Sequence, residues 1–131
     1  MDFKDEIIGR TEEFHRVFKL GIETKPTNIT KSTYDLRYHL MKEENEEYLA
    51  ACENNDLVEI GDALGDMLYV LCGTMVEHGF QSKIEAIFQE IHRSNMSKLD
   101  ENGQPIYRAD GKVIKSNLFF KPNIQKILLD D

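Results

Sequence analysis

The sequence predicts an all-α protein: an antiparallel bundle of about four main helices, completed by dimerisation, with a small C-terminal β-hairpin. Three observations lead to this prediction. Apolar residues recur at helical spacing along four long segments, each segment carries its own start and stop signals, and the connecting loops are short. A chain of 131 residues can bury one core, so we expect a single domain over residues 1–131.

The first two helices are predicted over residues 2–20 and 32–53. Asp2 is expected to cap the first helix, and Gly21 is expected to end it. Ser32, with Asp35 three positions later, resembles a capping box that opens the second helix.

The third and fourth helices are predicted over residues 56–78 and 82–93. Asp56 with Glu59 has the capping-box spacing at the start of the third helix, and Gly79 supplies its stop. Ser82 with Glu85 repeats the capping-box pattern at the start of the fourth.

The chain changes character after Asn95. Residues 105–108 and 112–115 flank the turn-forming Ala109-Asp110-Gly111, which predicts a β-hairpin. Residues 122–129 are expected to form one short closing helix.

The third helix carries apolar side chains on almost every side: Leu64, Met67, Leu68, Tyr69, Val70, Leu71, Cys72, Met75 and Val76. A helix that is apolar all round must be buried all round. Four helices of this size cannot cover one of their own completely, so we expect a homodimer, or a homotetramer, with this helix at the interface.

Composition excludes several classes of protein. The 16 Lys and Arg against 24 Asp and Glu give a net charge of -8 and disfavour binding to nucleic acid or to anionic membranes. No apolar run approaches the ~18 residues of a spanning helix and no secretory leader is recognisable, so a cytoplasmic protein is expected. Cys52 and Cys72 lack metal-ligand spacing and are predicted to be reduced core residues.

The acidic residues of the second helix are the most informative feature of the sequence. At about 100° per residue, Glu43, Glu44 and Glu47 share the stripe through which Leu36 and Leu40 face the bundle, whereas Glu46 and Glu53 lie on the opposite side. The same geometry places Glu59, Asp62 and Asp66 on one stripe of the third helix, although Glu59 also has the position of a capping-box partner.

These carboxylates have no local cations to balance them. Residues 43–82 contain no Lys or Arg, and residues 43–66 contain nine acids. Carboxylates gathered at a partly buried site either take up protons or require cations. Oxygen ligands without Cys or His suit a hard dication, so the sequence predicts an Mg²⁺ or Mn²⁺ site.

The spacing Leu36-Arg37-x-x-Leu40-x-x-Glu43-Glu44-x-x-Glu47, followed by Glu59-x-x-Asp62, resembles the EExxE…ExxD signature of the all-α nucleoside triphosphate pyrophosphohydrolases. This superfamily includes MazG-like proteins, phosphoribosyl-ATP pyrophosphohydrolases and dimeric dUTPases. Residues 92–98 and 111–115 also resemble the C-terminal part of phosphoribosyl-ATP pyrophosphohydrolase-like proteins. The likeness extends over about residues 33–122, and the short segment between the two acidic motifs argues against dUTP as the substrate.

The resemblance implies a division of roles among these acids. Glu44, Glu47, Glu59 and Asp62 would coordinate Mg²⁺, and Glu43 would help to activate the attacking water. Such enzymes cleave between the α- and β-phosphates of a nucleotide and release a nucleoside monophosphate and pyrophosphate.

Positive charge is concentrated near the C-terminus, where residues 92–126 carry seven Lys and Arg against three acids. Asn95 and Lys98 are therefore candidates to contact a base or sugar and a phosphate, although both residue types are also ordinary at helix C-termini. Arg37 is a third candidate, for a phosphate or for pairing with Glu44.

Two other interpretations compete with a pyrophosphohydrolase. A di-iron carboxylate bundle needs repeated Glu-x-x-His pairs, and only Glu12-x-x-His15 has that spacing. A non-catalytic helical dimer whose acidic stripes bind metal for stability, or meet a basic partner, is the second alternative.

Overall fold

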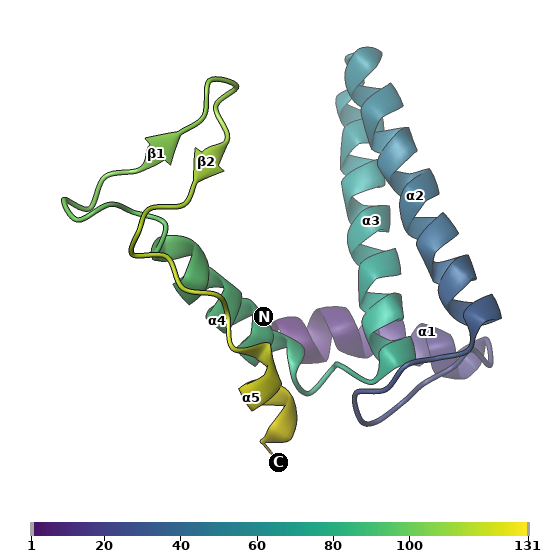
Figure 1. Ribbon diagram of the computed structural model, residues 1–131. Helices are drawn as coiled ribbons and strands as arrows, with labels where there is room; N and C mark the ends of the chain where they lie inside the picture. Colours follow the sequence, from purple (N-terminus) through teal and green to yellow (C-terminus); the bar gives the residue numbers. More distant parts are fainter. Residues whose placement is uncertain (1, 131) are drawn as a thin grey trace. The chain divides into compact units, whose positions relative to one another are not determined.

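The computed structural model describes residues 2–130 and confirms a mostly helical protein with one small hairpin (Figure 1). The chain divides into two compact units, Met1–Ser82 and Lys83–Asp131. The first contains a π-helix η1 (Phe3–Ile8) and helices α1 (Gly9–Val17), α2 (Lys31–Glu53) and α3 (Leu57–His78). The second contains α4 (Ile84–Met96), β1 (Ile106–Tyr107), β2 (Val113–Ile114) and α5 (Ile124–Leu129).

The central feature of the first unit is the pair α2 and α3, which lie side by side and antiparallel (Figure 1). The Asp56 carboxylate caps α3 by accepting a hydrogen bond from the Glu59 amide at 3.1 Å. Gly79 ends α3 with φ of 76°, a left-handed conformation that glycine adopts without a steric penalty. Both ends of this helix agree with the sequence prediction.

The two capping boxes that were predicted at Ser32 and Ser82 are wrong. Helix α2 begins at Lys31 after Thr30, and α4 begins at Ile84, and neither start has a side-chain cap. Asp35 instead accepts a hydrogen bond from the Lys31 ammonium group at 2.5 Å. A helix that packs against a neighbour can begin without a capping side chain, because tertiary contacts supply most of its stability.

The first helical segment also departs from the prediction. Asp2 does act as a cap, but the segment is divided into η1 and α1, and the helix ends at Val17 instead of reaching Gly21. Lys19 takes the left-handed turn, with φ of 60°.

The core of the first unit lies where α1 packs against the C-terminal half of α3. His15 is 2% exposed, and its Nδ1 donates to the Gly21 carbonyl at 2.9 Å and lies 3.6 Å from Glu77. Cys72 is buried there as predicted. Cys52 is exposed on α2, so the prediction that it lies in the core is wrong.

Gly73 provides a sharp test of this packing. A Cβ at position 73 would lie 2.6 Å from Arg37 Nη2 and 2.8 Å from His15 Nε2, and both side chains are buried. We expect Gly73→Ala to lower the free energy of unfolding by about 1–3 kcal/mol, as overpacking does. Gly65→Ala, in the same helix with nothing within 4 Å of the added Cβ, should be neutral or stabilising. Chemical denaturation measures both, and equal effects would contradict the packing argument.

The second unit displays the hairpin at the end of α4. Strands β1 and β2 pair antiparallel, with Ile106 opposite Ile114 and Tyr107 opposite Val113. Helix α5 packs on α4, and the buried Ser94 hydroxyl donates to the Phe120 carbonyl at 2.7 Å. The hairpin and the short closing helix are confirmed.

Much of α3 lies open to solvent in the single chain. Leu57 is 81% exposed and Leu64 is 52% exposed. These exposures describe a single chain and do not test assembly, so the homodimer stays a prediction. Across residues 2–130, no helix has the length and apolar character that a membrane crossing requires.

Candidate metal centre

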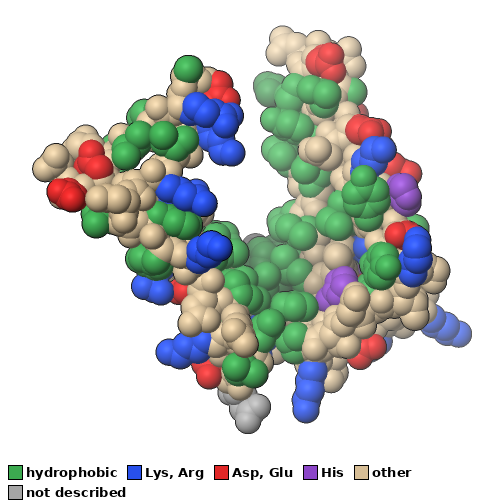
Figure 2. All heavy atoms as spheres, viewed as in Figure 1, with side chains coloured by type: hydrophobic (Ala, Val, Ile, Leu, Met, Phe, Trp, Pro, Cys, Tyr) green, Lys and Arg blue, Asp and Glu red, His purple; other side chains and the backbone are tan. Residues whose placement is uncertain are grey.

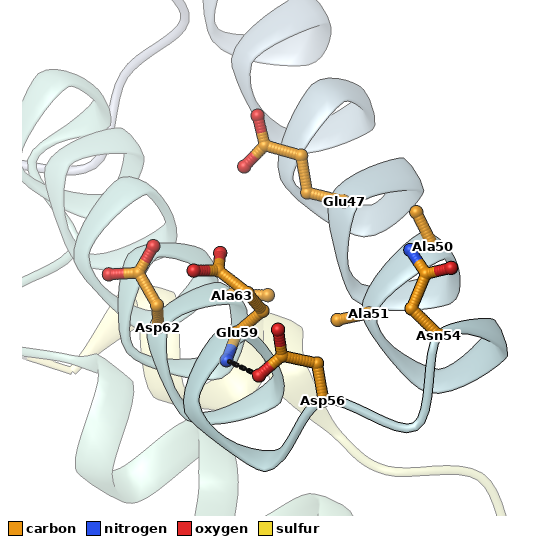
Figure 3. Close-up of a pocket in the computed structure, with 8 residues that line it drawn as sticks. All are labelled: Glu47, Ala50, Ala51, Asn54, Asp56, Glu59, Asp62 and Ala63. Carbon is orange, nitrogen blue, oxygen red and sulfur yellow. Dashed lines mark hydrogen bonds between the residues drawn. The ribbon is translucent and has the colours of Figure 1, made fainter.

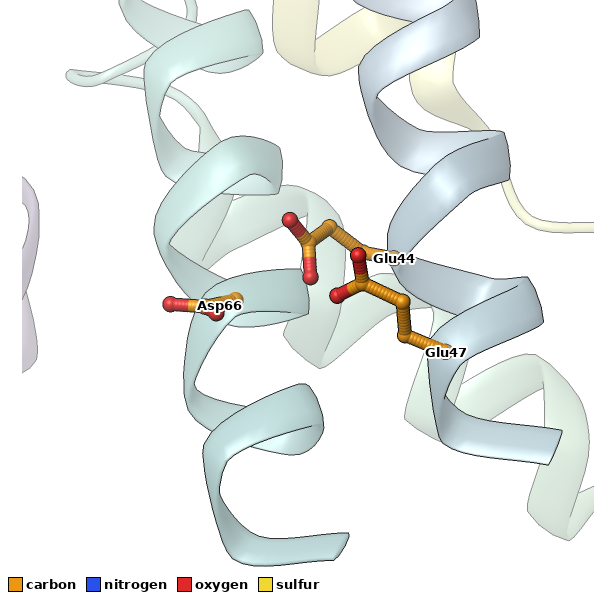
Figure 4. A group of neighbouring side chains, drawn as sticks. All are labelled: Glu44, Glu47 and Asp66. Atoms are coloured by element: carbon orange, nitrogen blue, oxygen red, sulfur yellow. The ribbon is translucent and has the colours of Figure 1, made fainter. Parts of the chain in front are cut away.

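Three carboxylates gather between α2 and α3 in the first unit. Glu44 and Glu47 lie one turn apart on α2, and Asp66 lies close to them on the neighbouring helix α3 (Figure 4). One oxygen from each of the three lies within 4.8 Å of the others. Three like charges at this separation repel one another unless a proton or a cation lies among them.

Glu44 is the electrostatic centre of the group. Its Oε2 atom is buried and has no hydrogen-bond partner among the described residues. Burial, hydrogen bonding with Glu47, and the charges of Glu47, Asp66 and Asp62 raise the pKa of Glu44 to about 7. A buried acceptor without a donor is costly, and a bound cation would satisfy it.

Asp66 shares this environment. Burial and the neighbouring charges of Asp62 and Glu47 raise its pKa above the ordinary value for an aspartate. The shifts at both Asp66 and Glu44 involve Asp62, which lies one turn before Asp66 on α3. Asp62 therefore belongs electrostatically to the same cluster.

A hollow of about 210 Å³ lies next to this cluster, towards the loop that joins α2 and α3. Figure 3 shows Glu47 facing Glu59 and Asp62 across it. Small side chains, Ala50, Ala51 and Ala63, leave the space open. Glu47 lines the hollow and also belongs to the three-carboxylate group, so it connects the two.

The carboxylate of Glu59 is not used in a reciprocal capping box. Asp56 accepts from the Glu59 amide, but the Asp56 amide donates to the Ala51 carbonyl at 3.1 Å. The amide that a Glu59 side chain would have capped is therefore already occupied. The Glu59 side chain is exposed and lines the hollow.

Asp66 is the residue that the predicted ligand set omits. The helical phasing had placed it on the acidic stripe with Asp62, but the ExxD pattern ends at Asp62. Only the position of α3 relative to α2 brings Asp66 opposite Glu44 and Glu47.

The other predicted site residues lie in different surroundings. Glu43 is exposed, next to Glu44 on α2. Arg37 is 7% exposed and donates from Nη2 to the Val70 carbonyl at 2.9 Å and from Nε to the Thr74 hydroxyl at 3.1 Å. Its burial lowers the pKa of the guanidinium, and Glu77 opposes this shift. These contacts join α2 to α3, and no ion pair with Glu44 is found among the described residues.

Asn95 and Lys98 belong to the second unit. Asn95 is an exposed residue of the last turn of α4, and the Lys98 amide donates to its carbonyl at 3.1 Å. The side chains of both residues lie at the end of α4 from which the hairpin segment begins.

The acidic group fits a hard dication by the chemistry of its donors. Every donor is a carboxylate oxygen, and Glu44, a member of the group, has one buried oxygen without a hydrogen-bond partner among the described residues. Mg²⁺ and Mn²⁺ prefer oxygen ligands of this kind.

A family model described as phosphoribosyl-ATP pyrophosphohydrolase matches residues 11–95, which include α2, α3 and the acids of the candidate metal centre. No curated protein matches the chain.

Proposed function

The chain belongs to the phosphoribosyl-ATP pyrophosphohydrolase family, and from this premise we propose that it hydrolyses a nucleoside triphosphate or a related nucleotide between the α- and β-phosphates, with Mg²⁺ as cofactor. The products are a nucleoside monophosphate and pyrophosphate. The family points to nucleotide pyrophosphohydrolase chemistry in general terms. The observation that carries the proposal is the group formed by Glu44, Glu47 and Asp66, with its orphaned buried oxygen.

The proposed ligands are Glu44, Glu47, Glu59 and Asp62, together with Asp66. Glu44 and Asp66 lie with Glu47 in the tight group, whereas Glu59 and Asp62 line the adjoining hollow. Mg²⁺, or Mn²⁺ in its place, held by these carboxylates would offset phosphate charge and would make a nearby water more acidic.

The remaining roles fall to groups outside this ligand set. Glu43 is exposed beside Glu44, and we assign it the uptake of a proton from the attacking water. Asn95 and Lys98 are proposed contacts for the base or sugar and for a phosphate. Arg37 is assigned a supporting role, because its Nε already donates to the Thr74 hydroxyl and its Nη2 to the Val70 carbonyl.

A substrate panel tests this proposal. The purified protein is incubated with Mg²⁺ and each (d)NTP or phosphoribosyl-ATP, and released pyrophosphate and monophosphate are quantified. We expect both products in equal amounts from at least one nucleotide, and none in the presence of EDTA. Release of orthophosphate would place the cleavage elsewhere, and no release from any nucleotide would favour the non-catalytic metal-binding dimer.

We also propose that the exposed apolar face of α3 is covered by a second copy of the chain, as a homodimer or homotetramer. Leu57, Val58 and Leu64 are each more than half exposed, and such a face is costly to leave in water. Sedimentation should give a multiple of 15.2 kDa, and Leu64→Glu should lower it. A monomer at micromolar concentration would contradict this assembly.

A further inference from the structure

We propose that one face of the β1–β2 hairpin is a nucleotide-binding surface, on which Tyr107 stacks against the base and Lys115 contacts a phosphate. This inference rests on the proposed function for its choice of ligand. The surface lies outside the residues 11–95 that match the family model. The assigned metal site does not include it.

The register of the hairpin defines this face. Tyr107 is opposite Val113. Lys115 follows directly after the last residue of β2, and continued alternation of side chains puts it on the face of Tyr107 and Val113. Lys112 directly precedes β2, and the same alternation puts it on the opposite face, with Ile106 and Ile114. We call the face of Tyr107, Val113 and Lys115 the tyrosine face.

The tyrosine face is open. Tyr107 is 62% exposed and Val113 is 43% exposed. An exposed aromatic ring beside an apolar side chain offers the flat surface on which a nucleobase stacks. Figure 2 shows the second unit, where Lys and Arg side chains are interspersed with hydrophobic ones.

Lys115 supplies an uncompensated positive charge at this face. Its ammonium group lies 4.7 Å from the centre of the Phe119 ring, which restricts its position without neutralising it. Arg108, at the tip of the hairpin, differs in that it is paired with Asp110. Within residues 2–130, no carboxylate lies within ion-pair distance of Lys115. The available charge at this face is therefore that of Lys115.

Both ends of the hairpin segment are anchored, so the face is presented on a supported element. The Ser116 hydroxyl donates to the Leu99 carbonyl at 2.7 Å, and the Phe120 amide donates to the Ser97 hydroxyl at 3.1 Å. The hydroxyl of Ser94, which is 2% exposed, donates to the Phe120 carbonyl. A surface that is ordered before binding loses less entropy on binding.

The charge of the whole chain favours a mononucleotide over a nucleic acid. A long polyanion would be repelled by the net charge of -8 that the chain carries. A nucleoside triphosphate is small enough to be held by local contacts. Its base suits Tyr107, and its phosphates suit Lys115.

Binding of a non-hydrolysable analogue tests this inference separately from catalysis. The probe is a nucleoside triphosphate with a methylene group between the α- and β-phosphates, measured by calorimetry with Mg²⁺ on the full chain. Its base is that of the best substrate, or adenine if no substrate is found. We expect Tyr107→Ala to raise Kd about fivefold or more, the lower end of the range for base–aromatic stacking. Tyr107→Phe should bind as the wild type does.

The matched control for charge is Lys112→Ala. Lys115→Ala should raise Kd at least about threefold at low ionic strength, and this effect should shrink as salt is added. Lys112→Ala removes the same charge from the opposite face and should change Kd less than twofold. Equal effects of the two lysine variants would mean that only the general charge matters, and would overturn the inference.

The remaining outcomes separate the two proposals. If Tyr107→Ala weakens analogue binding but no nucleotide is cleaved, the proposed function fails and the binding surface stands. If the wild type releases pyrophosphate but Tyr107→Ala and Lys115→Ala bind the analogue normally, the surface is wrong and the function stands. Tighter binding of a single-stranded oligonucleotide than of the analogue, lost in Tyr107→Ala, would identify a nucleic-acid surface and overturn the inference.

Discussion

Glu47→Gln is expected to abolish turnover and to weaken Mg²⁺ binding while raising the thermal stability of the metal-free protein. Glu47 lies in the group with Glu44 and Asp66 and also faces Glu59 and Asp62 across the hollow. Loss of groups that merely support metal ligands costs about 10–100-fold, so loss of this ligand should cost at least that much in activity. Removing one of several repelling charges stabilises the metal-free protein.

Initial rates, calorimetric Mg²⁺ titration and thermal unfolding in EDTA measure these three effects. The same three quantities should change in the same direction in Glu44→Gln, Asp66→Asn, Glu59→Gln and Asp62→Asn. The gain in metal-free stability should be largest for Glu44→Gln and Asp66→Asn, because the folded state raises the pKa values of the Glu44 and Asp66 carboxyl groups. Glu43→Gln should lower turnover more than metal affinity.

Glu46→Gln is the matched control. Glu46 is exposed on α2 and lies outside both the three-carboxylate group and the hollow. The activity, Mg²⁺ affinity and melting temperature of the Glu46→Gln variant should stay close to those of the wild type. A loss comparable to that of Glu47→Gln would show that general negative charge on α2, and not a specific site, is responsible.

The metal-free protein should lose stability as the pH rises from about 4.5 to above 7. The ordinary pKa of a glutamate is 4.5, and the folded protein raises that of Glu44 to about 7. Between these values the folded state binds more protons than the unfolded state, so the free energy of unfolding falls with increasing pH. The raised pKa of Asp66 acts in the same direction.

Thermal unfolding in EDTA across this pH range measures the effect. Mg²⁺ should restore stability increasingly towards pH 7.5, because the cation replaces the protons that the carboxylates release. The Glu44→Gln variant has no titratable group at position 44, so its melting temperature in EDTA should vary less with pH. A wild-type melting temperature that rises steadily through pH 7 without metal would contradict the raised pKa of Glu44.

Local features were predictable from the sequence because they depend on bonds between residues that are close along the chain. The cap at Asp56 spans three residues, the stop at Gly79 depends on its own φ, and the hairpin follows from the turn at residues 109–111. The acidic stripe on α2 was also predictable, since helical periodicity alone places Glu44 and Glu47 together. The family signature lies within these same segments.

Relations between helices were not predictable in the same way. Whether Asp66 faces Glu44 depends on how far α3 slides and rotates against α2, and no spacing within one helix specifies this. Arg37 illustrates the same limit, because its partners Val70 and Thr74 are 33 and 37 residues away. The capping pattern at Ser32 failed because packing of α2 on α3 stabilises the helix without that cap.

The sequence by itself therefore determined where the main helices lie along the chain, the hairpin, the family and the excess of carboxylates. The tertiary structure decided which carboxylates lie close enough together to hold one cation. Their repulsion and their capacity to bind a common cation depend on distances between atoms of two helices. It also left one Glu44 oxygen buried without a donor. Electrostatic energy varies with separation and burial, and both are fixed only when α2 and α3 pack together.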